Sequence, residues 1–316
     1  MPVTADARLA FCFPGQGSQA VGMGRAFHDA SPAARAVFEE ASDTLGFDVA
    51  KLCFEGPESE LQLTANTQPT VLTVSVAGAR LLAERGLAPA VVGGHSLGEY
   101  SALVAAGALA FADAVRVVRL RGEFMQEAVP VGTGAMAAIL GAELPVVEAI
   151  CREAAGGEVL DVANINSPGQ IVVAGHRSAV ERAVAVAPAH GVKRSVVLPV
   201  SAPFHCRLMA PAAERLAAVL GGIRAVDPGA PVVRNVDAEL TTRAADVRPF
   251  LVRQVTAPVR WTDCVGRMAR EGCGTFLEVG PGKVLTGLLK RIDGALAGVA
   301  VEDVAGIDRA AAALGV

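Results

Sequence analysis

Short apolar runs alternate along the chain with longer segments that carry the helical spacing of apolar residues. In the first part of the chain, the pattern predicts strands at residues 9–13 and 90–93 and helices at 37–45, 69–84 and from 99 onward. In the last part, it predicts helices at 207–220, 261–271, 285–292 and 308–314 and strands at 232–235 and 276–279. Alternation of this kind is typical of a mainly parallel sheet covered by helices.

The order of predicted strands and helices changes in the middle of the chain. Here the pattern predicts, in order, a strand, a helix, two strands, a helix and a strand, at 135–140, 144–155, 159–165, 171–174, 179–189 and 195–198. This order is that of a ferredoxin-like unit. We therefore predict a small ferredoxin-like domain, 131–199, inserted into a large α/β-hydrolase-like catalytic domain formed by 1–130 and 200–316.

Composition and charge exclude several classes of function. The 316 residues are 52% hydrophobic with a formal net charge of −4, so the chain lacks the basic footprint of a nucleic-acid-binding protein. No apolar run reaches the roughly 18 residues of a membrane span, and the nearest, 102–112, predicts a buried helix.

Asp6 precedes any apolar run and no basic leader is present, so we expect a cytoplasmic protein without a signal peptide. The six cysteines form no CxxC pair and predict reduced thiols and no metal site.

One short motif carries candidate chemistry. Residues 94–98 match G-x-S-x-G and lie between a predicted strand and a predicted helix. A serine in that setting occupies a tight turn that exposes its hydroxyl, which makes Ser96 a candidate nucleophile. The N–H of Leu97 points from a helix start and can stabilise an oxyanion. The alternative is a glycine-rich turn that contains serine by chance, and the bare pattern alone does not exclude it.

A serine hydroxyl needs a base, and the chain has five histidines. His28 falls on a polar helix, His176 in a turn and His190 at a helix end, while the side chain of His95 should point away from the neighbouring hydroxyl. Elimination leaves His205, which precedes a predicted helix just after the inserted segment. No partner acid is obvious, so a backbone carbonyl could hold the imidazole tautomer instead, as in a Ser-His dyad.

Seven segments, taken in order, resemble malonyl-CoA:acyl-carrier-protein transacylases. They are FPGQGSQ at 13–19, GHSLGEY at 94–100, RG at 121–122, MQ at 125–126, NINSPGQ at 164–170, PFH at 203–205 and EVGPGK at 278–283. These segments span nearly the whole chain. The resemblance implies transfer of a malonyl group from malonyl-CoA, through a serine acyl-enzyme, to the thiol of an acyl carrier protein. It also implies a monomer that needs no cofactor, with coenzyme A entering as part of the substrate.

The resemblance assigns roles to the central residues of the site. It makes Ser96 the nucleophile and His205 the general base, and it places the amides of Gln16 and Leu97 in the oxyanion hole. The carbonyl of Gln254 would orient the imidazole.

The resemblance also implies which residues contact the substrate. Arg121 would bind the free malonyl carboxylate, a group that a guanidinium can grip with two parallel hydrogen bonds. From the sequence alone, a surface arginine is the simpler interpretation, because Arg116 and Arg119 lie close by. Phe204 is related to the choice between malonyl and methylmalonyl groups, and Asn164 would lie near the site.

Three alternatives stay open at this point. Residues 15–20 follow a predicted strand and fit the dinucleotide fingerprint G-x-G-x-x-A, but the acids at the right spacing, Glu39 and Glu40, fall inside a helical pattern. A simple serine hydrolase or thioesterase would share the nucleophile turn without needing Arg121. A stand-alone acyltransferase that loads polyketide synthase carrier domains would use the same chemistry on a different carrier.

Overall fold

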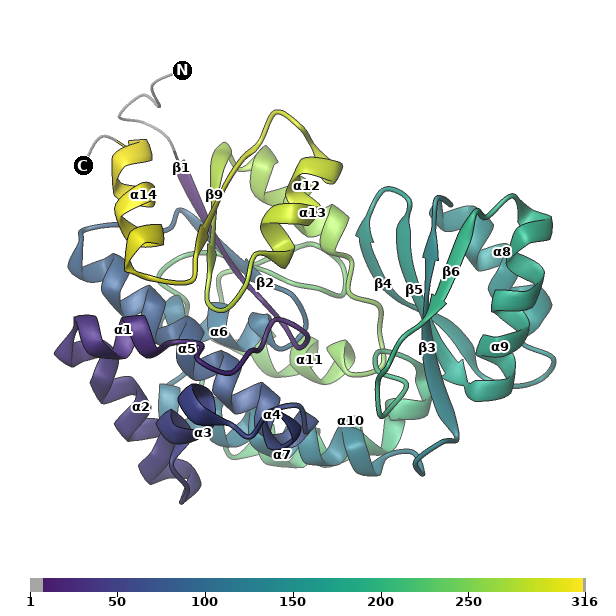
Figure 1. Cartoon of the computed structure of the whole chain (residues 1–316), viewed down its shortest axis with the longest axis horizontal. Helices are drawn as coiled ribbons and strands as arrows, with labels where there is room; N and C mark the ends of the chain where they lie inside the picture. The colour runs from purple at the N-terminus through teal and green to yellow at the C-terminus, as the bar shows by residue number, and fades with distance from the viewer. Residues whose placement is uncertain (1–7, 315–316) are drawn as a thin grey trace.

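The structure is a computed structural model that describes residues 8–314; Asp6, on which the prediction about a signal peptide rests, lies outside that range. The fold is mixed α/β with two separate sheets (Figure 1). The larger sheet has the order β10-β9-β1-β2-β7-β8. Its strands are β1 (Arg8–Phe13), β2 (Val91–Gly94), β7 (Val232–Val233), β8 (Leu240–Thr241), β9 (Cys273–Val279) and β10 (Ala297–Val301).

The larger sheet is parallel except at one edge. Strand β1 lies between β2 and β9 and pairs with both in parallel, β9 pairs in parallel with β10, and β2 with β7, whereas the short β8 is antiparallel to β7. The predicted mainly parallel sheet is therefore confirmed. Because parallel strands end at the same edge, the loops that follow β1 and β2 lie side by side there.

Helices cover both faces of this sheet. They are α1 (Arg25–Ala30), α2 (Pro32–Leu45), α3 (Val49–Glu55), α4 (Glu58–Leu61), α5 (Thr64–Glu84), α6 (Gly98–Ala105), α7 (Phe111–Glu127), α10 (Ala210–Gly221), α11 (Ala244–Gln254), α12 (Trp261–Arg270), α13 (Val284–Ile292) and α14 (Val304–Leu314). None of the helices in the described part of the chain is long and apolar enough to cross a membrane.

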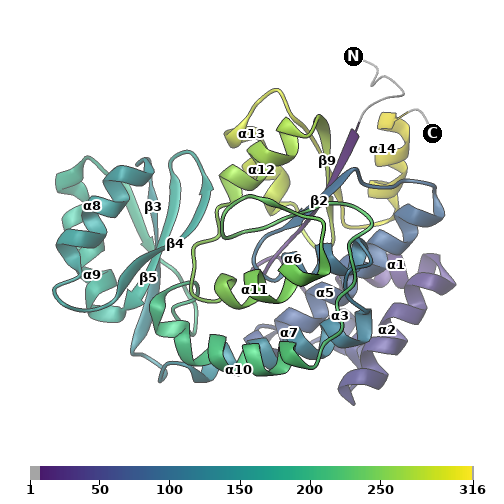
Figure 2. The same ribbon diagram turned by 180° about the vertical axis from the view of Figure 1, so that it is seen from behind.

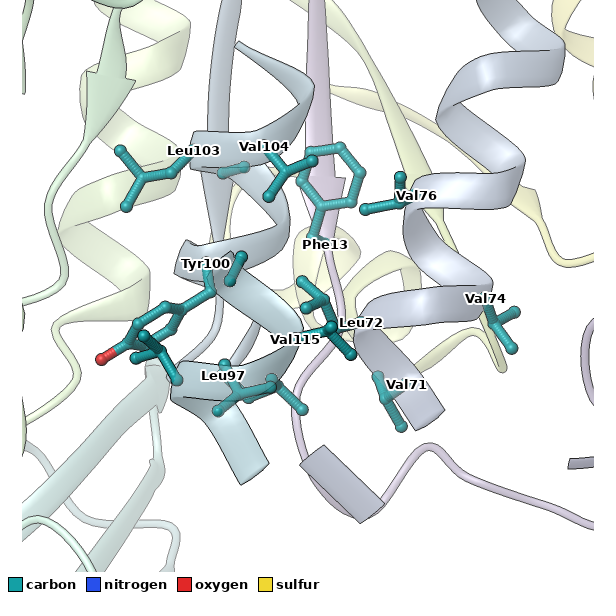
Figure 3. Packing of buried hydrophobic residues seen from close by; sticks show 14 of the residues in the cluster. Phe13, Val71, Leu72, Val74, Val76, Leu97, Tyr100, Leu103, Val104 and Val115 are labelled. Atoms are coloured by element: carbon teal, nitrogen blue, oxygen red, sulfur yellow. The ribbon is translucent and has the colours of Figure 1, made fainter. Parts of the chain in front are cut away.

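The side chains of β1 show how the sheet is buried on both faces. Leu9, Phe11 and Phe13 belong to the cluster that includes α5, α6 and α7, whereas Ala10 and Cys12 belong to the cluster that includes α12 and α13. Figure 3 shows Phe13 packed among the apolar side chains of α5 and α6. Successive strand residues point to opposite faces, so a strand that is apolar throughout must be covered on both sides.

The smaller sheet is built from the middle of the chain. Its elements are β3 (Gly134–Leu140), α8 (Leu144–Ala154), β4 (Leu160–Ser167), β5 (Gln170–His176), α9 (Arg177–Val186) and β6 (Arg194–Val197). The strands are antiparallel in the order β4-β5-β3-β6. In both views α8 and α9 lie on the outer face of this sheet, away from the larger one (Figures 1 and 2). The predicted succession of strands and helices is thus observed.

The two sheets are joined by direct backbone contacts. Val259, in the loop before α12, accepts a hydrogen bond from the N–H of Ile165 at 2.8 Å and donates one to the carbonyl of Ala163 at 2.9 Å. The inner face of the smaller sheet also contributes Met136 and Val172 to the main apolar cluster. The smaller sheet is therefore fixed against the larger part of the molecule.

Three predictions about these elements are wrong. The helix predicted from residue 99 onward is interrupted: α6 ends at Ala105, Gly107 takes φ +73°, and α7 begins at Phe111. The apolar segment 102–112 is therefore not one buried helix, because a left-handed glycine in its middle ends the first helix. The strand predicted at 232–235 stops at Val233, because the next residues turn toward the β2–α6 loop.

Two glycines allow the β2–α6 turn to pack against β1. A Cβ atom on Gly98 would lie 2.0 Å from the carbonyl oxygen of Phe13, and a Cβ atom on Gly94 would lie 2.0 Å from the carbonyl oxygen of Gly98. Both contacts are with backbone, so no rotamer change can relieve them.

We expect Gly98→Ala to lower the free energy of unfolding by at least about 1–3 kcal/mol, the usual cost of overpacking a core. Gly287, in the exposed middle of α13, serves as the control, because a Cβ atom there would meet no other atom within 4 Å. Gly287→Ala should raise stability by about 0.5–1 kcal/mol, because alanine favours a helix. Urea titration of both variants tests this, and equal stabilities would contradict the close approach.

Candidate active site

The centre of the site is a turn with strained backbone. Ser96 lies between β2 and α6 with φ +52°, a left-handed conformation that is uncommon for residues other than glycine. The turn is tied to β1 because the N–H of His95 donates to the carbonyl of Phe13 at 2.9 Å, and it closes on itself through a 2.9 Å bond from the N–H of Gly98 to the carbonyl of His95. The predicted strand-turn-helix context of the G-x-S-x-G motif is therefore present.

The imidazole of His205 lies against this serine. Ser96 Oγ and His205 Nε2 are 2.7 Å apart, and Nδ1 of the same ring is 2.9 Å from the carbonyl oxygen of Gln254. A carbonyl only accepts, so Nδ1 carries the proton and Nε2 is left free to accept from the serine hydroxyl. Burial and the charge of Arg121 lower the pKa of His205 from 6.5 to about 3, which keeps the ring neutral.

Arg121 is buried, contrary to the expectation from sequence alone. Only 2% of this α7 residue is exposed. Its Nη2 donates to Ser96 Oγ at 3.1 Å and to Oε1 of Gln254 at 2.9 Å, and its Nη1 donates to Oε1 of Gln68 at 2.8 Å. The helix turns this side chain inward, while Arg116 and Arg119 form ion pairs with carboxylates on the same helix.

Two backbone amides are available next to the serine. Gln16 follows β1 and Leu97 follows Ser96, and both line the same cavity. Within residues 8–314, neither N–H has a hydrogen-bond partner. The Leu97 amide stands at the start of α6, where helix N–H groups favour negative charge. Two such donors can stabilise an oxyanion.

The cavity that holds these groups has a volume of about 550 Å³ and lies between the larger and smaller parts of the molecule. The larger part contributes Gln16, Ser96 and Arg121, and the β4 residue Asn164 comes from the smaller part. Phe204 also lines the cavity and is 9% exposed. All eight site residues predicted from the sequence therefore lie in this region, since Gln254 contacts both His205 and Arg121.

Four residues of this network were missed by the sequence analysis. Gln68 holds Arg121, Asn166 is 2.8 Å from His95 Nε2, and Asn235 accepts from the N–H of Ser96 at 2.7 Å. Glu99, on α6, contacts both Asn235 and Gln254. Two of them carried a sequence signal: Glu99 is a carboxylate in an otherwise apolar helix, and Asn166 lies in the segment 164–170 that carries the family resemblance. The others are brought in from distant segments.

The structure does not support a dinucleotide site. The fingerprint needs an acid at the end of a second strand, but Glu39 and Glu40 lie within α2. The described residues also contain no group of three His, Cys, Asp or Glu side chains that could hold a metal ion.

Comparisons with known proteins agree with the chemistry of this cavity. A family model described as an acyl transferase domain matches residues 10–311. A malonyl CoA-acyl carrier protein transacylase of Escherichia coli K12 is 54% identical over 90% of this chain and 93% of its own length. One of Bacillus subtilis is 48% identical over 94% of each chain.

Solved structures are similar over nearly the whole fold. An acyl carrier protein S-malonyltransferase from Vibrio cholerae has a TM-score of 0.94 and 49% identity, covering 96% of this chain and 100% of the other. A malonyl-transacylase solved in complex with its type II polyketide synthase acyl-carrier protein has a TM-score of 0.94 and 50% identity, covering 96% and 99%.

The lowered pKa of His205 can be measured directly. We expect the ring ¹⁵N shifts of His205 to remain those of the neutral Nδ1–H tautomer as the pH is lowered from about 7 to about 5, whereas an unshifted histidine is mostly protonated at the lower value. NMR of ¹⁵N-histidine-labelled protein provides the measurement, and His205→Ala assigns the signal. A titration with a midpoint near the ordinary value would contradict the neutral ring.

Proposed function

Because this chain belongs to the acyl transferase family, we propose that it transfers the malonyl group of malonyl-CoA to the phosphopantetheine thiol of an acyl carrier protein. It is an acyltransferase enzyme, and we assign it to the supply of malonyl groups for fatty-acid synthesis. One observation carries the proposal: Ser96 Oγ lies 2.7 Å from a neutral imidazole and 3.1 Å from a buried guanidinium. The imidazole supports attack on a thioester, and the guanidinium supports recognition of a carboxylate.

In the first half-reaction, Ser96 Oγ attacks the thioester carbonyl of malonyl-CoA while its proton passes to His205 Nε2. The carbonyl oxygen becomes an oxyanion, which the N–H groups of Gln16 and Leu97 stabilise. When the oxyanion collapses, the C–S bond breaks and the coenzyme A sulfur takes the proton from His205. The product is a malonyl ester of Ser96 and free coenzyme A.

The carbonyl of Gln254 takes the place of the acid of a Ser-His-Asp triad. It accepts the Nδ1 proton of His205 at 2.9 Å and so keeps the tautomer whose Nε2 can act as a base. A neutral carbonyl stabilises the imidazolium less than a carboxylate does. The neighbouring Arg121 also disfavours the imidazolium, so the proton should move on quickly to the leaving thiolate.

Arg121 gives a physical reason for choosing malonyl over acetyl groups. The oxygens of Gln68 and Gln254 hold its guanidinium from two directions, which fixes its plane next to the nucleophile. A carboxylate bound there would meet a preoriented, partly desolvated cation. An acetyl group would leave that charge without its anionic partner, so acetyl-CoA should react poorly. Phe204 and Asn164 line the same cavity and would limit the size of the acyl group.

In the second half-reaction, the thiol of the carrier's phosphopantetheine arm attacks the malonyl ester. His205 takes the thiol proton and returns it to Ser96 Oγ as the ester bond breaks. The cavity between the larger and smaller parts would admit this arm. Carrier domains of a polyketide synthase are the second candidate acceptor, because a similar malonyl-transacylase is solved with such a carrier.

We also propose names for the two parts of the molecule. The larger part, 1–130 and 200–316, would be the α/β-hydrolase-like catalytic domain, and 131–199 the ferredoxin-like domain that closes the other side of the cavity. The strand order β4-β5-β3-β6 with two helices on one face supports the second name.

The acyl-enzyme can be detected by intact-mass spectrometry after mixing the protein with malonyl-CoA or acetyl-CoA. We expect a malonyl adduct that is absent in Ser96→Ala. In Arg121→Ala, the malonyl-to-acetyl ratio of acylation rates should fall by about 10²-fold, since charged hydrogen bonds contribute about 1.5–3 kcal/mol each. Arg116→Ala, an exposed arginine on the same helix, is the control. An unchanged ratio in Arg121→Ala would exclude the carboxylate role.

Transfer and hydrolysis differ in what consumes the adduct. We expect the malonyl ester to persist in buffer and to disappear when a holo acyl carrier protein is added, with malonyl-carrier appearing in equal amount. An apo carrier, which lacks the thiol, is the control. Rapid release of free malonate without carrier would mean that the protein is a hydrolase.

A further inference from the structure

Glu99 is a carboxylate buried at the centre of the molecule. It lies in the first turn of α6 and has no exposed surface. A buried charge is costly unless it is paired and hydrogen-bonded. The N–H of Asn235 donates to Oε1 at 2.7 Å, and Nε2 of Gln254 donates to Oε2. Both partners donate, so the ionised carboxylate fits this position.

The two partners of Glu99 also hold the backbone of the nucleophile. Oδ1 of Asn235 accepts from the N–H of Ser96 at 2.7 Å, and Nε2 of Gln254 donates to the carbonyl of Ser96 at 2.9 Å. Nδ2 of Asn235 donates to the carbonyl of Gly94 at 2.7 Å. Both peptide groups that flank the left-handed Ser96 are therefore tied, through one intermediate residue each, to the same carboxylate.

Glu99 also helps to determine which way the Gln254 amide faces. Because the carboxylate only accepts, Nε2 of Gln254 faces Glu99, and Oε1 must then face Arg121, where it accepts at 2.9 Å. The carbonyl of Ser96, which accepts from the same Nε2 at 2.9 Å, favours this orientation too, so loss of the carboxylate would remove one of the two acceptors that hold the NH₂ group. The backbone carbonyl of the same residue holds His205. Gln254 thus contacts the nucleophile, the base and the arginine.

Glu99 balances the charge of the site as well. Burial lowers the pKa of Arg121, and the nearby Glu99 opposes that change. The Gln254 amide bridges the two groups, accepting from the cation and donating to the anion. Burial raises the pKa of Glu99 from 4.5 to about 8, because the hydrogen bonds from Asn235 and Gln254 and the charge of Arg121 offset only part of the lost hydration. These two donors and the cation are the groups that favour the ionised form.

We propose that Glu99 is a positioning residue that sets the reactivity of Ser96 by holding Asn235 and Gln254 in their present orientations. It does not touch the reacting atoms. Its effect on acylation by malonyl-CoA rests on the proposed function, but its effect on the serine does not depend on which acyl group is used.

The test replaces Glu99 by glutamine, which keeps the shape but substitutes an NH₂ donor for one acceptor. The new NH₂ group must face either the Asn235 N–H or the Gln254 NH₂ group, both of which are donors, so one of the two hydrogen bonds is lost. The readout is the rate at which a fluorophosphonate labels Ser96: the O–P bond forms, fluoride leaves and the serine proton passes to His205. We expect Glu99→Gln to slow labelling by about 10- to 100-fold, the effect of displacing a reacting group by a fraction of an ångström to 1 Å.

Two control variants separate positioning from general stability. Glu278 is also buried, but its carboxylate accepts from the N–H groups of Leu285 and Thr286 and from the Thr286 hydroxyl, all at the start of α13. Glu278→Gln should lower the melting temperature and leave the labelling rate within about twofold of wild type. Ser101→Ala removes a buried α6 hydroxyl that has no hydrogen-bond partner within the described residues, and it should change neither quantity.

The outcomes are distinct. The proposal would be overturned if folded Glu99→Gln were labelled at the wild-type rate. It would also be overturned if a smaller fraction of the variant were labelled but at an unchanged rate. If Glu99→Gln does not fold, Asn235→Ala, which removes the bond to the Ser96 N–H, must show the slower labelling instead; a wild-type rate there would also overturn it.

Malonyl-CoA kinetics add a second readout. Glu99→Gln should lower kcat for acylation more than it raises KM, because the change displaces the backbone of Ser96 while Gln68 still holds Arg121. A raised KM with unchanged kcat would show that Glu99 serves binding alone, against the proposal. If wild-type protein is labelled by the fluorophosphonate but forms no malonyl adduct, the proposed function fails while the role of Glu99 still stands.

Discussion

The left-handed backbone of Ser96 is the constraint on which the rest of the site depends. Such a conformation costs about 1–3 kcal/mol for a residue other than glycine and persists only when the surroundings hold it. Gly94 and Gly98 let α6 approach β1 closely enough to form the turn, and side chains from two later segments hold its N–H and carbonyl groups. The hydroxyl is thereby directed at His205 and the cavity.

Electrostatics in this cavity follow from burial. Burial of the imidazole, together with the charge of a neighbouring guanidinium that is 2% exposed, lowers the pKa of His205 and keeps the ring neutral. The same guanidinium is held by uncharged amide oxygens, and Gln254 separates it from the buried carboxyl group of Glu99. A substrate carboxylate can therefore approach Arg121 without displacing a direct ion pair.

Local sequence patterns predicted a good part of this. Strand β1, the G-x-S-x-G turn and the order of elements around the smaller sheet follow from apolar spacing and glycine placement, and elimination singled out His205. The burial of Arg121 could not be predicted, because its helix also carries the exposed Arg116 and the half-buried Arg119. Asn235 was assigned to a strand, since nothing near it indicates a contact with a residue 139 positions earlier. Such contacts depend on how the strands are ordered, which a single periodic pattern does not specify.

The insertion of the smaller sheet between α7 and α10 separates Ser96, along the chain, from the residues that contact it. Ser96 and Glu99 are synthesised early, whereas His205, Asn235 and Gln254 lie more than 100 residues later, and β9, a direct neighbour of β1, follows them all. A nascent chain that has emerged only through the smaller sheet therefore carries Ser96 without His205 and without the two side chains that hold its backbone. We therefore expect the site to be assembled only when the final third of the chain has folded back onto the first.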